Sequence, residues 1–301
     1  MYIEDEIAAL KKEKEAIILA HYYVPDEVQA YADYVGDSFG LAKKAVETEA
    51  KVIVFAGVDF MGESAKMLNP DKKVLMPDAT ATCPMAHMAD TATIEKARAQ
   101  YDDLAVVCYV NSTAAVKAAS DVCVTSSNAV KIVKKLPQKN IFFTPDKNLG
   151  HYVSTQVPDK HFILNQGFCP RHDTVDPDYV KKVQAAHPKA LFLAHPECRK
   201  EVLALADYVG STSGIIDYAG SSDAKEFIIG TEGGVFYELE TRNPDKVFYP
   251  AMEEAYCINM KKVTLEKVRD CLRDETNEVF VDSKIAGQAV RALERMLALA
   301  E

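Results

Sequence analysis

The amino-acid sequence predicts an α/β protein of three homologous three-layer αβα domains, with parallel sheets in a pseudo-three-fold arrangement around a central active site. The first observation is an internal repeat, in which Ala16–Leu41, Leu104–Val130 and Ala190–Ile216 align without a gap. The second is the alternation of continuous apolar runs with amphipathic stretches, which is typical of buried parallel strands joined by helices. The predicted domains are residues 1–102, 103–188 and 189–301, the last with additional C-terminal helices.

The first half of each repeat carries three kinds of polar residue at matching positions. An opening apolar strand ends at His21, Tyr109 and His195. A carboxylate follows at Asp33, Asp121 and Asp207. A second short strand then leads to a hydroxyl at Ser38, Ser126 and Thr212, just before a predicted helix. These matches indicate that each repeat folds into the same βαβ arrangement.

The second half of each repeat contains another buried strand and then a cysteine. The apolar runs are Val52–Ala56, Ile141–Thr144 and Phe227–Gly230. The tripeptide Pro-Asp-Lys follows at Pro70–Lys72, Pro158–Lys160 and Pro244–Lys246. One cysteine then follows in each repeat, at Cys83, Cys169 and Cys257 respectively. Beyond the repeats, Thr264–Arg273 and Ser283–Leu299 have the apolar spacing of amphipathic helices.

Composition and charge exclude several classes of protein. Hydrophobic residues make up 48% and charged residues 27%, so the chain has enough apolar surface to fold. The formal charge is −10 and no basic run offsets it, which argues against nucleic acid and anionic membranes as partners. There is no apolar run of about 18 residues, the start is acidic rather than cationic, and the seven cysteines include no Cys-x-x-Cys pair. We therefore expect a cytoplasmic protein.

Polar clusters lie where the opening strands end, which is where parallel α/β sheets bind ligands. The clusters that we expect to bind substrate or to act in catalysis are His21 with Tyr23, Tyr109-Val110-Asn111, and His195-Pro196-Glu197. Ser38, Ser126 and Thr212 place hydroxyls near helix N-termini, an arrangement that binds carboxylate or phosphate. The alternative is that these hydroxyls only cap helices. No Gly-x-Gly-x-x-Gly or Walker A motif indicates a nucleotide.

The three repeat-equivalent cysteines predict a metal site, because pseudo-three-fold symmetry brings equivalent positions together. Three thiolates from distant segments suit an iron–sulfur cluster with one iron open to substrate. The alternative is a zinc site in which His172 or His87 joins the three cysteines. We interpret Cys108, Cys123 and Cys271 as core residues. Cys198 follows the His195 cluster and is a candidate for a position near the site, but no other repeat has an equivalent cysteine.

At this point the motifs resemble those of the quinolinate synthases, over nearly the whole chain. The matching stretches include Leu19–Tyr23, Ala32–Ser38, Phe55–Met61, Thr125–Asn128, Gly167–His172, Ala194–Cys198, Gly210–Ser213 and Cys257–Lys261. The resemblance implies one [4Fe-4S] cluster per chain, held by Cys83, Cys169 and Cys257. It also implies condensation of iminoaspartate with dihydroxyacetone phosphate to quinolinate, phosphate and two waters, with an upstream enzyme that produces the iminoaspartate. The C-terminal Cys-x-x-Cys cluster of some longer members is missing here.

The implied reaction needs proton transfers and a Lewis acid, a role that suits the open iron. Glu197, Tyr23 and Tyr109 are the candidate proton carriers, and His21 and His195 are candidate donors to carboxylate or acid–base partners. Ser38, Ser126, Thr212 and Asn111 are expected to hold carboxylate or phosphate oxygens, with Ser211 and His172 as secondary candidates. Two alternatives stay open: another iron–sulfur hydro-lyase acting on a dicarboxylate, and a non-enzymatic iron–sulfur sensor or electron carrier.

Overall fold

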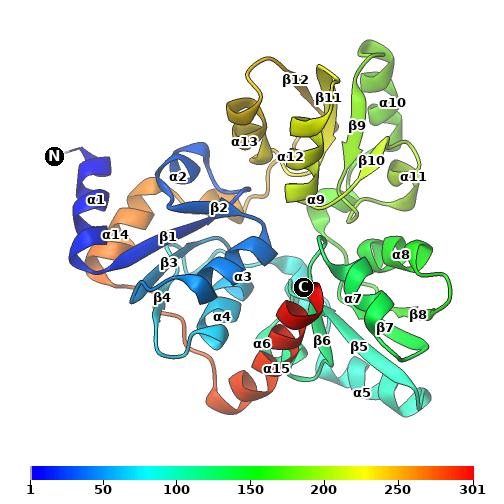
Figure 1. The fold of residues 1–301 in the computed structure, drawn as a ribbon, viewed down its shortest axis with the longest axis horizontal. Helices are drawn as coiled ribbons and strands as arrows, with labels where there is room; N and C mark the ends of the chain where they lie inside the picture. Colours follow the sequence, from blue (N-terminus) through cyan, green and yellow to red (C-terminus); the bar gives the residue numbers. More distant parts are fainter. Residues whose placement is uncertain (1) are drawn as a thin grey trace.

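The computed structural model describes residues 2–301 and contains three four-stranded sheets in which every strand pairing is parallel. Within each sheet the strands lie side by side in the order second, first, third and fourth. Figure 1 shows the sheets as three lobes around a common centre, each flanked by helices. The prediction of an α/β fold with three αβα domains is therefore confirmed.

The first lobe contains the sheet nearest the N-terminus, and its third strand is buried at every residue. This burial explains why the strand reads as an unbroken apolar run. Its elements are α1 (Ile3–Glu13), β1 (Ala16–His21), α2 (Asp26–Tyr31), β2 (Tyr34–Gly36), α3 (Ser38–Glu47), β3 (Val52–Ala56), α4 (Asp59–Leu68), β4 (Lys73–Leu75) and η1 (Pro84–His87).

The second lobe repeats this order, and here it is the first strand that is buried at every residue. Its elements are α5 (Thr91–Gln100), β5 (Leu104–Tyr109), α6 (Ala114–Ala118), β6 (Val122–Val124), α7 (Ala129–Lys135), β7 (Asn140–Thr144), α8 (Lys147–Gln156), β8 (His161–Leu164) and α9 (Pro170–Asp173). Cys108 and Cys123 face each other across β5 and β6 and are fully buried, as expected of core residues.

The third lobe is formed by the next sheet and its helices. Its elements are α10 (Pro177–Ala186), β9 (Leu191–Ala194), α11 (Lys200–Leu203), β10 (Tyr208–Val209), α12 (Thr212–Ser221), β11 (Glu226–Gly230), α13 (Val235–Arg242), β12 (Val247–Pro250) and η2 (Met260–Lys262). In all three lobes the strands end toward the centre of the molecule, so the loops that follow them converge there (Figure 1).

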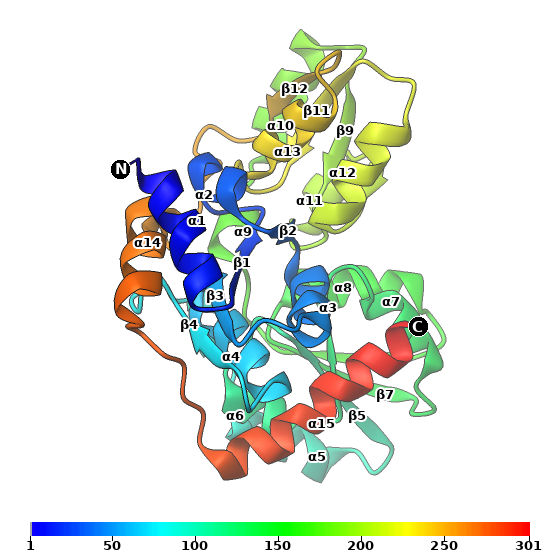
Figure 2. The same ribbon diagram turned by 60° about the vertical axis from the view of Figure 1, so that its left-hand side comes forward.

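The two C-terminal helices, α14 (Leu265–Asp274) and α15 (Ser283–Ala300), form where the apolar spacing predicts them. They pack away from the third lobe: α14 lies against α1, and α15 packs on α4, α6, α7 and β6 (Figure 2). The division into residues 1–102, 103–188 and 189–301 stays a prediction, and the last range holds helices that brace the other two lobes. Among residues 2–301, no helix has both the length and the apolar character needed to cross a membrane.

The repeated aspartates stabilise the centre of each sheet. Each one accepts a hydrogen bond from a backbone N–H of the first strand while its own N–H donates back to the same residue. The pairs are Asp33 with Ile18, Asp121 with Val106, and Asp207 with Phe192, with N···O distances of 2.7–2.8 Å to the carboxylates. The three side chains therefore fix the loop that leads into the second strand.

The lysine of each Pro-Asp-Lys tripeptide binds the C-terminal end of the helix that joins the second and third strands of its sheet. Lys72 Nζ donates to carbonyls of Ala45 and Thr48 at the end of α3. The equivalent contacts join Lys160 to Leu136 and Gln138, and Lys246 to Ala219 and Ser222. A cation there satisfies carbonyls that have no intrahelical partner and complements the helix dipole. The tripeptide is thus a scaffold feature of the repeat.

Candidate active site

A cavity of about 150 Å³ lies where the three lobes meet. Most of the predicted site residues line it, and they come from all three repeats. They are His21, Tyr23, Ser38, Cys83, Tyr109, Asn111, Ser126, Cys169, His195, Glu197, Thr212 and Cys257. Val110 and Pro196 are absent from this lining, because they lie in the chain between residues that face the cavity. The cavity also includes Arg171, a basic side chain that the sequence patterns did not single out.

The cavity cysteines occupy equivalent positions at the start of short helical turns. Cys83 precedes η1, Cys169 precedes α9, and Cys257 lies shortly before η2; all three are free and half-buried. Burial raises the pKa of the Cys83 thiol to about 12, and the charge of Glu197 adds to this pKa shift. Burial also raises the pKa of Cys169 and Cys257. A metal that binds here must therefore displace protons from the thiols.

The remaining cysteines do not line this cavity. Cys108, Cys123 and Cys271 are buried in the apolar core, as expected. Cys198 is also fully buried, and it packs with Phe192 and Val202 in the core of the third lobe rather than at the site. Cys198 therefore lies beside the site residue Glu197 in the chain but does not line the cavity, because the turn after His195 directs it under β11, where its thiol contacts the carbonyl of Gly230.

Glu197 is buried between two partners at the centre of the site. The hydroxyl of Tyr109 donates to Glu197 Oε1 at 2.6 Å, and His172 Nδ1 lies 2.6 Å from Oε2. Burial alone would raise the pKa of Glu197, but the adjacent His172 and His195 and the hydrogen bonds from His172 and Tyr109 lower this pKa to about 2. Glu197 is therefore a carboxylate that can accept a proton.

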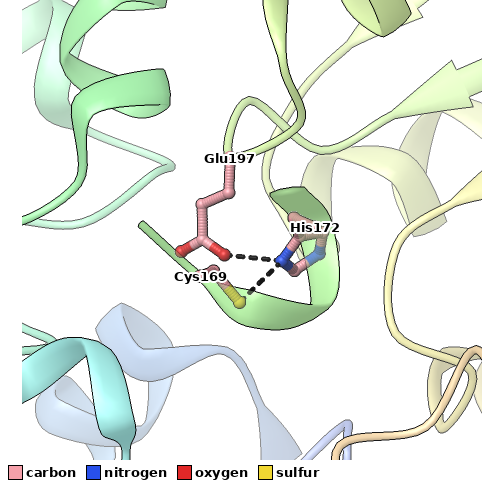
Figure 3. A group of neighbouring side chains, drawn as sticks. All are labelled: Cys169, His172 and Glu197. Atoms are coloured by element: carbon pink, nitrogen blue, oxygen red, sulfur yellow. Dashed lines mark hydrogen bonds and ion pairs between the residues drawn. The ribbon is translucent and has the colours of Figure 1, made fainter. Parts of the chain in front are cut away.

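His172 joins Glu197 to one of the cysteines (Figure 3). Its Nδ1 lies 3.2 Å from Cys169 Sγ as well as close to Glu197, and the three side chains together have the spacing of a metal-binding group. His172 is only 1% exposed, and it is held in α9, the turn that begins just after Cys169. His87, the other histidine considered for zinc, lies outside the cavity lining and bonds to Thr82.

Thr231 was not expected from the sequence, yet it connects two of the predicted residues. Its hydroxyl lies 2.8 Å from the Tyr23 hydroxyl and 2.9 Å from His172 Nε2. Tyr23 also bonds to Thr212 at 2.6 Å. One consistent proton assignment runs from Thr212 through Tyr23, Thr231 and His172 to Glu197. Thr231 directly follows β11, so its place at a strand end was the signal available in the sequence.

His21 and His195 have the same environment in the first and third lobes. In each case Nδ1 accepts the backbone N–H of the residue two positions later, Tyr23 or Glu197, at 3.2 and 3.3 Å. Burial lowers the pKa of both histidines to about 3, so the rings are neutral and carry their proton on Nε2. His195 Nε2 lies 3.2 Å from Ser126 Oγ. The first and third lobes thus each present an N–H donor to the cavity.

Other residues cap the helices near the site, so the alternative that the Ser38 and Thr212 hydroxyls only cap helices does not hold. Asp37 caps α3 by accepting the N–H groups of Phe39 and Gly40, and Ser211 caps α12. Ser38 and Thr212 are therefore the first helical residues, and their hydroxyls are not used as caps. Among the described residues, the buried Asn111 Oδ1 has no hydrogen-bond partner, which suits an atom that awaits a ligand.

Sequence reasoning also missed three carboxylates that contact the cysteine loops. Asp59, Asp146 and Glu232 each follow the third strand of a sheet and accept the backbone N–H of the cavity cysteine in their own lobe. A signal for them exists in the sequence, since an acidic residue precedes each of the three cysteines at nearly the same separation.

Comparison with known proteins places the chain in a family. The sequence model of the family described as quinolinate synthetase A protein matches residues 5–298. Similar proteins include the quinolinate synthase of Caldicellulosiruptor bescii, 53% identical over 98% of this chain and 97% of the relative, and that of Fusobacterium nucleatum, 53% identical over 99% of each. Quinolinate synthase 2 of Methanosarcina acetivorans is 50% identical over 99% of this chain and 96% of the relative. The chain belongs to the quinolinate synthetase A family.

Proposed function

We propose that this chain is an iron–sulfur enzyme that condenses iminoaspartate with dihydroxyacetone phosphate to form quinolinate, phosphate and two waters. Family membership supports quinolinate formation, since relatives that cover nearly the whole chain carry the name quinolinate synthase. The observation that carries the proposal is that one cysteine from each repeat lines the same cavity as Glu197, Tyr23 and Tyr109. Cysteines and acid–base groups therefore share one ligand-sized space.

Cys83, Cys169 and Cys257 would hold the [4Fe-4S] cluster, one per chain. The donor set fits, because three free thiols from separate loops face one space and each lies at the start of a short turn. Three protein ligands leave one of four irons open. When bound, such a cluster supplies a Lewis acid for oxygen or nitrogen atoms of the substrate.

The protein's own groups handle the protons that the reaction requires. Glu197 is an ionised carboxylate that holds the Tyr109 hydroxyl at 2.6 Å, so this pair can accept and return a proton at the phenolic oxygen. Tyr23 reaches Glu197 through Thr231 and His172, which gives a second phenol a route to the same carboxylate. Burial and the charge of Glu197 raise the pKa of both phenols, so both are protonated donors at neutral pH.

Fixed donors and hydroxyls would bind the anionic ends of the substrates. His21 and His195 present neutral Nε2–H groups from opposite lobes, and neither needs to change protonation when a carboxylate arrives. Ser38, Ser126 and Asn111 line the same space. Arg171 is a cation at the cavity, which suits a dicarboxylate or a phosphate ester in a protein of net charge −10.

The zinc alternative requires His172 to exchange an existing contact for the metal. Its Nδ1 contacts Glu197 at 2.6 Å and its Nε2 contacts Thr231 at 2.9 Å, and a site with three cysteines would replace one of these contacts. A sensor or electron carrier is disfavoured because such proteins saturate their clusters with protein ligands, whereas this cavity is lined by acid–base groups.

The test is to load the protein anaerobically with iron and sulfide and to supply both substrates. Quinolinate and phosphate should form in equal amounts, and metal analysis should give about four irons per chain. A matched reaction without dihydroxyacetone phosphate, and a hydration assay on unsaturated dicarboxylates, separate condensation from a simple hydro-lyase. A loaded protein that makes no quinolinate, or one that binds a single zinc instead, would refute the proposal.

A further inference from the structure

One carboxylate in each lobe binds the backbone of that lobe's cavity cysteine. The three carboxylates lie just after the third strand of their sheets, and the cysteines lie beyond the fourth strand. The hydrogen bonds run from Cys83 N to Asp59 Oδ1 at 3.3 Å, from Cys169 N to Asp146 Oδ2 at 3.1 Å, and from Cys257 N to Glu232 Oε1 at 2.8 Å. The same contact thus recurs three times.

The same carboxylates also bind the start of the helix that follows the third strand. Asp59 accepts the N–H of Phe60 at 2.8 Å, Asp146 accepts that of Leu149 at 2.7 Å, and Glu232 accepts that of Gly234 at 2.6 Å. Each side chain therefore ties a cysteine loop to a helix that is anchored in the sheet. A loop held at that point has fewer backbone conformations available.

The lobes differ in how the two bonds are shared. Asp146 and Glu232 are buried and use a separate oxygen for each N–H. The Asp59 side chain is 38% exposed, and its Oδ1 accepts both N–H groups while Oδ2 accepts the Thr82 hydroxyl. A carboxamide could therefore replace Asp59, since its NH₂ can donate to a hydroxyl. At Asp146 and Glu232 the NH₂ of a carboxamide would face a backbone N–H, and two donors cannot form a hydrogen bond with each other.

We infer that Asp59, Asp146 and Glu232 are positioning residues that aim the three cysteines at a common point and so hold the cluster in place. This inference rests on the proposed function, because it assumes that the three cysteines bind the cluster. The second-strand aspartates Asp33, Asp121 and Asp207 provide the contrast. They also accept backbone N–H bonds, but these come from the first strand and not from a cysteine loop.

The experiment compares anaerobically loaded wild type with Asp59→Asn, Asp146→Asn and Glu232→Gln. The rate of iron loss to a chelator is measured together with the electron paramagnetic resonance spectrum of the reduced cluster. Outer partners of metal ligands typically contribute on the order of 10–100-fold to metal binding. Asp146→Asn and Glu232→Gln should therefore lose iron about tenfold faster or more and show an altered spectrum, whereas Asp59→Asn should stay within about twofold of wild type.

Two controls separate positioning from charge and from general stability. Glu232→Asp keeps the negative charge but shortens the side chain, so it should lose iron as fast as Glu232→Gln if the hydrogen bond is what matters. Asp121→Asn, in the same lobe as Cys169, should lower the unfolding temperature of the cluster-free protein without changing the rate of iron loss. The unfolding temperature is measured for every cluster-free variant, to show that the variant is folded.

The inference is overturned if Asp146→Asn and Glu232→Gln retain iron as wild type does, or if Asp121→Asn loses it equally fast. It is also overturned if Glu232→Asp behaves as wild type, since charge would then account for the effect. A wild-type protein that takes up no cluster overturns the proposed function as well, so the two failures are distinguished by the wild-type measurement.

Discussion

The two ends of each sheet differ in how closely the three repeats match. At the amino end of the fourth strand every lobe uses a lysine that binds a helix C-terminus, and every second strand is preceded by an aspartate that braces the first. At the carboxyl end the equivalent residues diverge, with His21 and His195 in two lobes and Tyr109 in the third. Repetition is thus complete in the scaffold and broken in the cavity.

This difference follows from what each end contacts. The scaffold residues bind peptide groups, which are the same in every lobe, so the same side chain serves three times. The cavity would bind unsymmetrical substrates, which place a different group before each lobe. The hydroxyls of Ser38, Ser126 and Thr212 recur at this end, and so do the cysteines with the carboxylates that bind their backbone. Three equivalent thiols suit a cluster that presents similar irons to each lobe.

The largest effect should come from removing a cavity cysteine. Cys169→Ser should lose the cluster and all quinolinate formation, because one of three protein ligands is gone. Cys271→Ala, which changes a core cysteine on α14, should keep the cluster and most of the activity. Iron and sulfide per chain measure the difference. A loaded and active Cys169→Ser would show that this thiol is not a ligand.

Glu197→Gln should keep the cluster but lower turnover by about 10²–10⁴-fold, since the amide cannot accept a proton. The exposed Glu201→Gln on α11 is the matched control and should turn over normally. Single-turnover rates and iron content are measured on both. Normal turnover in Glu197→Gln would remove the acid–base role from this carboxylate.

The buried histidines should make the cluster-free protein less stable in acid. Their folded pKa is about 3 while the ordinary value is 6.5, so between these values the unfolded chain binds the proton and the folded chain does not. Stability therefore falls as pH drops below 6.5, by about 2 kcal/mol per histidine at pH 5. His21→Gln should remove one such contribution, whereas the exposed His161→Gln should not. Denaturant unfolding at pH 7 and 5 gives the slopes, and equal slopes for both variants would contradict this account.

The smallest effect should come from the scaffold. Lys160→Met removes the cation from the end of α7 and should lower the free energy of unfolding by about 1 kcal/mol, with the Michaelis constants unchanged. Lys182→Met, on the exposed face of α10, should change stability by less than about 0.5 kcal/mol. A loss of activity in Lys160→Met without a loss of stability would contradict the assignment of Lys160 to the scaffold rather than to the cavity.

Much of the architecture could be predicted because it depends on local patterns. The apolar runs became buried parallel strands, and the C-terminal apolar spacing became α14 and α15. The repeat also identified the residues at the strand ends as candidate site residues, and nearly all of them line the cavity. Val110, Pro196 and Cys198 show the limit of that reasoning, since adjacency in the chain does not decide which way a side chain points in a turn.

The three-fold repeat, the parallel sheets and the recurrence of one cysteine per lobe can be read from the sequence alone, since hydrophobic period and spacing are local properties. Three contacts emerged only with the folded chain: Thr231 joins Tyr23 to His172, Asp146 holds the loop of Cys169, and α15 packs on the first two lobes. No local pattern predicts them because they join segments far apart in the chain. Their distances depend on how the lobes pack against one another, and no local pattern encodes that placement.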